Sequence, residues 1–242
     1  MAGNSQGGGS TIVTGVQPPQ KPLNLLNAVS EIQQFGAIEV NMAQQLNKNY
    51  FTTQNRVDFF TIGLKNAITH LFFTIIFTPL SVGVIDNLIH LFGDKNLSLF
   101  DRIYALFLSL SISIGFAIFL SSLKNSYVGT VSKAMIRSLF EGLLFGEIFK
   151  VLVSFLVYQF IYIQMTPEHI VSFLLFLHKY FRPLLIKLNF NYLSAFHWLL
   201  NFRDVFPLAE LLILVSSVIL VAVPISIIMF SAYKGKKGIE NL

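Results

Sequence analysis

The chain of 242 residues contains no cysteine and only one tryptophan. The absence of cysteine excludes a disulfide scaffold and any cysteine-ligated metal site. Charged residues are also scarce, because they make up 12% of the chain where a soluble globular protein carries about 25%. Hydrophobic residues make up 54% of it. This balance predicts an integral membrane protein.

Motifs that carry catalysis are absent as well. The sequence has no H-E-x-x-H, no G-x-S-x-G, no phosphate-binding glycine loop and no carboxylates paired on facing elements. We therefore expect a protein that is not an enzyme and that uses no cofactor and no metal. The 17 basic residues are scattered along the boundaries of apolar segments, so a nucleic acid partner is not expected either.

The N-terminal quarter differs in composition from the rest. Residues 1–22 combine Gly, Ser, Thr, Gln and Pro, which predicts a flexible polar tail. The first twenty residues have neither a basic residue nor the apolar core of a signal peptide, so we expect an internal segment to start insertion. Residues 23–56 form an amphipathic cytoplasmic region in which apolar residues recur at helical spacing from 24 to 48. This helix could lie on a membrane or a partner, or pack within the protein.

Residues 57–242 are expected to form an all-α, polytopic transmembrane domain. Three apolar runs of about 20 residues or more, at 103–123, 139–163 and 208–230, have the length of a spanning helix. A fourth run at 67–85 is interrupted by Pro79, which membrane helices tolerate. Residues 168–203 are aromatic and apolar but often interrupted by charge, which favours interfacial or re-entrant helices broken near Pro183. If they instead form a spanning hairpin, the domain has six spans rather than four.

Basic residues indicate the orientation of these spans. Nine of them fall in the segments that are cytoplasmic in an N-in, C-in arrangement, and six fall in the segments on the other side. Because Lys and Arg concentrate in cytoplasmic loops, this bias favours N-in, C-in topology.

Small residues recur every fourth position on two consecutive spans. This spacing lets helix backbones approach closely, as in G-x-x-x-G pairs. We predict that the two series face each other in a tightly packed helical hairpin, rather than facing other subunits. The first series is Ala105, Ser109, Ser113, Ala117 and Ser121, and the second is Ser138, Gly142, Gly146 and Ser154.

Charged residues interrupt the third span. Glu141 falls near the inner headgroups, where Arg137 four residues earlier is its expected partner. Glu147 and Lys150 fall deeper, where each costs roughly 2.5 to 3.5 kcal/mol on insertion scales. Three residues apart, they can form an intramembrane charged pair. The structural interpretation, a self-neutralised pair that fixes register or docks a partner, is favoured over a role in an ion or proton path.

Two functions remain from these observations. The first is a non-enzymatic subunit of a multiprotein envelope complex, such as a secretion, conjugation or export assembly. The alternative is a small oligomeric transporter or channel that uses Glu147 and Lys150. The expected partners are the lipid bilayer and other membrane or envelope proteins, or further copies of the chain. Residue usage suits a multi-pass protein of the bacterial inner membrane.

Overall fold

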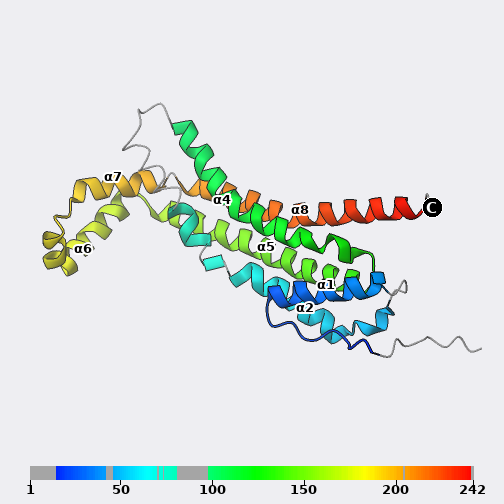
Figure 1. The fold of residues 1–242 in the computed structure, drawn as a ribbon. Helices are drawn as coiled ribbons and strands as arrows, with labels where there is room; N and C mark the ends of the chain where they lie inside the picture. The colour runs from blue at the N-terminus through cyan, green and yellow to red at the C-terminus, as the bar shows by residue number, and fades with distance from the viewer. Residues whose placement is uncertain are drawn as a thin grey trace, which may run out of the picture.

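The computed structural model describes residues 15–41, 46–69, 71–72, 74–80, 98–203 and 205–240. Within these ranges, the side chains of residues 98–109 and 235–240 are not described. All regular structure in the described residues is helical (Figure 1). The elements are α1 (Leu25–Asn41), η1 (Lys48–Tyr50), α2 (Thr53–Thr69), α4 (Ser98–Ser121), η3 (Ser122–Tyr127), α5 (Thr130–Gln164), α6 (Pro167–Lys187), α7 (Tyr192–Arg203) and α8 (Phe206–Glu240).

Three helical stretches among the described residues are long and apolar enough to cross a membrane, namely Thr53–Leu80, Pro167–Lys187 and Phe206–Lys234. The last contains the predicted span at 208–230. The first overlaps the predicted span at 67–85, of which residues 81–85 lie outside the described part. The predicted spans at 103–123 and 139–163 fall largely or wholly on α4 and α5. These two are not among the three stretches, and their crossing stays a prediction. The helices thus support a membrane protein.

Helices α2 and α5 pack closely along much of their length, and glycine makes this possible. A Cβ added to Gly63 on α2 would collide with the backbone at Leu139 and Leu143 of α5. One added to Gly142 would collide with the carbonyl oxygen of Phe60, and one at Gly146 would meet the Cβ of Ala67. Side chains at these positions would hold the helix axes apart. We call this contact of Gly63, Ala67, Gly142 and Gly146 the glycine seam.

The seam corrects the predicted pairing of the two small-residue series. Ser138, Gly142, Gly146 and Ser154 are buried, as expected for a packing face, but the nearest neighbours of the two glycines are Phe60, Leu64 and Ala67 of α2. Helix α4 instead packs mainly on α8. In the α4 series, Ala117 and Ser121 are buried and Ser113 is half-buried, whereas the side chains of Ala105 and Ser109 lie outside the described part. The spacing identified a close interface, but its predicted partner was wrong because Gly63 and Ala67 repeat the same spacing on α2.

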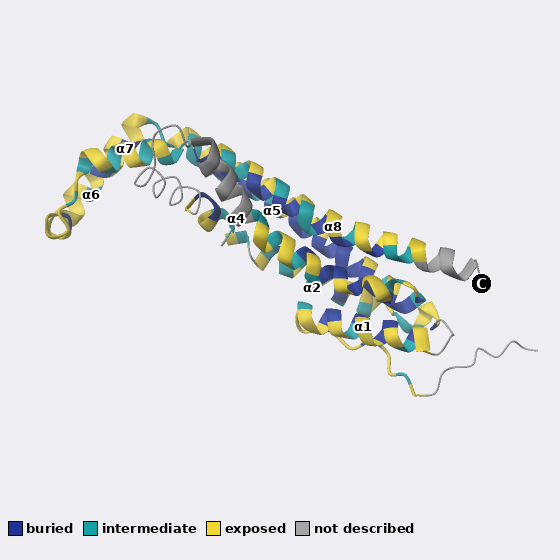
Figure 2. Cartoon of the chain, turned by 45° about the horizontal axis from the view of Figure 1, so that its top comes forward, coloured by how far each residue is buried: buried dark blue, intermediate teal, exposed yellow. Residues whose placement is uncertain are grey.

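Helix α1 packs within the protein. Its buried face consists of Ala28, Val29, Ile32, Phe35, Gly36 and Glu39, and it lies against η3 and α5. The apolar members of this face join the main core together with residues of α2, α5 and α8. The periodicity in residues 24–48 therefore marks an ordinary packing face at the end of the bundle where α8 also ends (Figure 2).

Helices α6 and α7 form a separate arm at the opposite end of the bundle (Figures 1 and 2). Thr166 caps α6 by accepting a hydrogen bond from the His169 N–H, and Pro167 fits the first turn. A kink at Phe181 precedes Pro183, so the predicted break near that proline is present. Asn189, with φ of 48°, makes the turn to α7 in a conformation that asparagine tolerates.

The glycine seam can be tested with a matched pair of substitutions. Gly142→Ala should destabilise the protein by about 1–3 kcal/mol, because the added methyl group overpacks the seam. Gly115→Ala on α4 is the control, since a Cβ there meets nothing within 4 Å, and it should leave stability unchanged or slightly raised. Thermal unfolding midpoints in mild detergent measure both. Equal midpoints for the two variants would contradict the seam.

Candidate functional site

The buried ion pair of Glu147 and Lys150 lies in the middle of α5. The Lys150 Nζ contacts Glu147 Oε2 one turn away on the same helix, and both side chains are more than nine-tenths buried. The positive and negative charges therefore neutralise each other inside one helix, as the spacing predicted. An ion pair in this setting is costly to break, because the remaining partner would be a buried, unpaired charge.

Lys150 belongs to a continuous buried row of α5 that repeats every fourth residue, from Ser138 to Tyr158. At one end of the row, Ser138 Oγ donates a hydrogen bond to the Arg56 carbonyl of α2. At the other end, Tyr158 Oη donates to the Ile75 carbonyl at 2.9 Å. Gly142 and Gly146 of the seam lie between Ser138 and Lys150. This row therefore holds the pair at a fixed depth along the helical stretch Thr53–Leu80.

Helix α8 runs antiparallel to α5 and sets the other side of the site. Gln159 Nε2 donates a hydrogen bond to Glu210 Oε1 at 3.0 Å, which fixes the register of the two helices. Ser217 lies two turns beyond Glu210 on α8. Because the helices are antiparallel, this position is beside the part of α5 between Lys150 and Ser154. The hydroxyls of Ser154 and Ser217 are buried and have no hydrogen-bond partner. The pair therefore lies at the level of unpartnered hydroxyls inside the bundle.

A second ionic cluster joins α2 to α5 at the start of the predicted third span. Arg137 Nε lies 2.7 Å from Glu141 Oε1, in the i, i+4 pairing expected from the sequence. Arg56 Nη2 of α2 lies 3.3 Å from the other carboxylate oxygen. The sequence did not reveal this second partner, because it lies 85 residues away along the chain.

Glu39 is a buried site residue that sequence reasoning missed. Its carboxylate accepts hydrogen bonds from the backbone N–H groups of Val131 at 2.8 Å and Ser132 at 3.2 Å, and from the Ser132 hydroxyl. It thus caps the N-terminus of α5, where a negative charge is favourable, in place of the N-cap residue Gly129, which has no side chain. A Cβ at Gly129 would collide with this carboxylate. The sequence signal for this site was an acidic residue, Glu39, among the apolar residues that form the buried face of α1.

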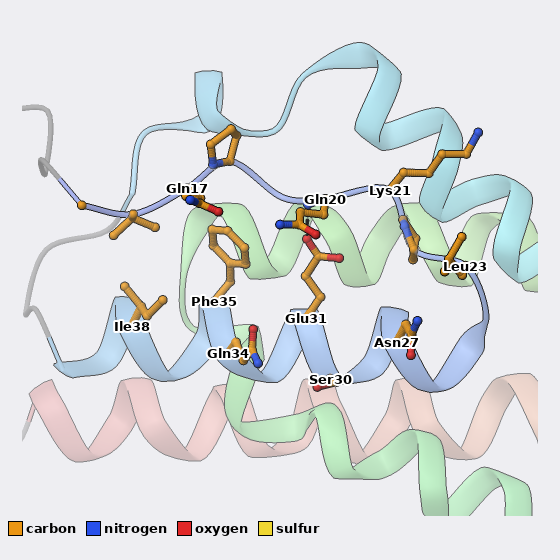
Figure 3. A pocket seen from close by; sticks show the side chains of 14 residues that line it. Gln17, Gln20, Lys21, Leu23, Asn27, Ser30, Glu31, Gln34, Phe35 and Ile38 are labelled. Carbon is orange, nitrogen blue, oxygen red and sulfur yellow. Dashed lines mark hydrogen bonds between the residues drawn. The ribbon is translucent and has the colours of Figure 1, made fainter.

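A polar groove lies between α1 and the extended residues 15–23, which we call the strap (Figure 3). The groove has a volume of about 800 Å³, and Gln17, Gln20, Asn27, Ser30 and Gln34 are among its lining residues. Burial raises the pKa of the Glu31 carboxyl, and a hydrogen bond from the Gln20 N–H opposes this effect. Residues 15–22 of the predicted flexible tail thus form one wall of a groove.

The strap is tied down at two further points. Tyr50 Oη donates a hydrogen bond to the Val16 carbonyl, and Lys21 Nζ lies 3.8 Å from Asp58 Oδ1 of α2. The groove is therefore attached to the same helix that forms the glycine seam.

Within the described residues, no three His, Asp or Glu side chains are grouped so that they could hold a metal ion. Comparisons with known proteins add no assignment, since no family model, no curated protein and no solved structure matches the chain.

The ion pair yields a test based on single and double substitutions. Glu147→Gln should cost about 3–5 kcal/mol, because it leaves the Lys150 ammonium buried without its counter-charge. The double variant Glu147→Gln with Lys150→Met should recover most of that loss. Thermal unfolding in detergent and the amount of protein in the membrane fraction check both. If the double variant is no more stable than the single one, the pair does not act as a self-neutralised unit.

Proposed function

We propose that this chain is a non-enzymatic integral membrane subunit of a multiprotein envelope complex. The observation that carries the proposal is the polar groove of the strap and α1, because it is a shaped surface joined firmly to a membrane bundle. The Glu39 cap links α1 to α5, and the Lys21 contact links the strap to α2. The groove is therefore held in a defined position beside α2 and α5.

The composition of the groove suits an extended polar segment of another protein. Gln, Asn and Ser side chains from both walls offer donors and acceptors, while Phe35 and Ile38 supply an apolar floor. Such a mixture matches the polar, hydrogen-bonding character of protein interfaces outside their apolar centre. Lys21 and Glu31 add one charge of each sign to the lining, so the partner that best fits the groove is a polar, extended peptide segment without a net charge.

We also propose an N-in, C-in arrangement in a bacterial inner membrane, and the direction of the helices is compatible with this topology. Gly63 pairs with Gly142, and Ile75 with Tyr158 further along, so α2 and α5 run parallel. Helices α4 and α8 run the opposite way, which brings α1 and the end of α8 to one end of the bundle (Figure 1). That end carries Arg56, Lys124, Lys133 and Arg137, and the count of nine basic residues against six along the chain agrees with a cytoplasmic side there.

The alternative function, a small oligomeric transporter or channel, is favoured by one observation. Ser154 and Ser217 have buried hydroxyls without partners at the level of the charged pair. A permeating ion or proton could use them together with Glu147. Against this, the carboxylate is already neutralised by Lys150 on the same helix, so we place the structural role first. Ion flux in proteoliposomes that is lost equally in Glu147→Gln and in the double variant Glu147→Gln with Lys150→Met, at unchanged protein levels, would support the alternative.

The subunit proposal predicts a large native particle. Extracted in mild detergent from its host at natural abundance, the tagged chain should co-purify with several different proteins. Gln34→Arg should release at least one of them, because it places a bulky charge in the groove. Ala37→Arg is the matched control on an exposed position of α1 outside the groove, and it should release none.

Two results would contradict this expectation. A small particle that contains only this chain would exclude the subunit and favour the transporter. A particle whose composition is unchanged by Gln34→Arg would show that partners bind elsewhere.

A further inference from the structure

The arm of α6 and α7 exposes an extended apolar surface away from the bundle. Phe173, Leu175 and Phe176 on α6 are at least half exposed, and Leu193 on α7 is 68% exposed. The two helices pack on each other. At the start of α6, His169 Nδ1 lies 3.0 Å from the Gln164 carbonyl oxygen of α5, and at the end of α7 Arg203 stacks on the Tyr162 ring at 4.3 Å. A surface of this kind in water would favour aggregation.

Between the two helices lies an apolar groove of about 610 Å³, within the range of small-molecule sites. Its lining residues are Val171, Leu174, Leu175, His178, Tyr192, Leu193 and Phe196. The two polar groups in this set bond to each other, since His178 Nδ1 lies 2.7 Å from Tyr192 Oη. The groove therefore offers an occupant an apolar wall, which suits a hydrocarbon chain.

Charge on the arm indicates the chemistry of the headgroup. Residues 167–203 contain four basic residues and one acidic residue. Of the basic residues, Lys179, Arg182 and Lys187 are exposed along the second half of α6. Lys179 follows the lining residue His178 in the chain, so the positive charges begin at the level of the groove along α6. Basic side chains next to an apolar face are typical of elements that bind anionic lipid surfaces.

From these observations we propose that the arm binds an anionic phospholipid, with an acyl chain in the groove of α6 and α7 and the headgroup phosphate at Lys179, Arg182 and Lys187. Although α6 is long and apolar enough to cross a membrane, in this proposal it lies at the boundary between headgroups and acyl chains, because Lys179, Arg182 and Lys187 are exposed along its second half. Trp198 of α7 then occupies the region that aromatic residues favour at membrane interfaces. This inference rests on the membrane location of the chain and not on the subunit proposal. A protein partner on the same surface is the outcome that would replace it.

Trp198 provides the measurement, because it is the only tryptophan of the chain and is 42% exposed on α7. The full chain is reconstituted in phosphatidylcholine vesicles that contain a minority of either dibrominated phosphatidylglycerol or dibrominated phosphatidylcholine, and bromine quenching of its fluorescence is followed. The mole fraction of brominated lipid that gives half-maximal quenching should be at least about fivefold lower for phosphatidylglycerol than for phosphatidylcholine. This ratio is expected because one basic side chain near an anionic surface favours binding by about that factor. Bromines near the ester groups should quench more than bromines at the chain ends.

Variants separate the headgroup from the chain. Lys179→Gln, Arg182→Gln and Lys187→Gln together should bring the ratio of the two mole fractions close to one. The control removes the same charge from exposed positions at the other end of the bundle, as Lys48→Gln, Lys124→Gln and Lys133→Gln, and should keep the ratio. Leu175→Asn with Leu193→Asn should weaken quenching by both lipids, because the groove no longer favours an acyl chain.

Four results would overturn the proposal. They are equal half-quenching by the two lipids in the natural chain, an absence of quenching, strongest quenching by bromines at the chain ends, and the same loss of preference in the control variant. The second result would mean that protein or water covers the arm, and the third that α6 crosses the bilayer. None of them bears on whether the chain purifies in a complex.

Discussion

The close approach of α2 and α5 at the glycine seam is the constraint on which the other features depend. Backbones can meet there because Gly63, Gly142 and Gly146 have no side chain to hold them apart. Without a hydrophobic driving force between helices in lipid, such contacts supply the packing attraction. The seam also fixes the register in which Arg56 reaches Glu141 and Tyr158 reaches the Ile75 carbonyl. The buried ion pair follows the seam directly along α5.

Local patterns in the sequence predicted the local features well. Helical periodicity predicted α1, four-residue spacing predicted a tight packing face on α5, and Pro183 predicted the break in α6. The pairings of Arg137 with Glu141 and of Glu147 with Lys150 were also predicted, because both lie within one helix. These features depend on residues three or four positions apart, which a helix brings together whatever the rest of the chain does.

Contacts between distant segments could not be predicted in the same way. The small-residue series on α5 fits any neighbour with matching small residues, and the chain offers two, on α2 and on α4. Glu39 caps α5 from 92 residues away, and nothing at positions 130–132 specifies which acidic residue will reach them. The groove of the strap depends on Tyr50 and Asp58 holding a segment whose composition indicates only flexibility. In each case tertiary packing selects one of several partners that the sequence allows.

The central claim is that the small face of α5 meets α2 and not α4, and thiol cross-linking tests it most directly because the chain has no cysteine of its own. The rings of Phe60 and Phe145 lie 5.9 Å apart across the seam, so a short bifunctional thiol reagent should join Phe60→Cys to Phe145→Cys in native membranes. Ala117→Cys with Ser138→Cys, which would join the two small-residue series, should not be linked. Efficient linkage of the second pair with none in the first would contradict the account.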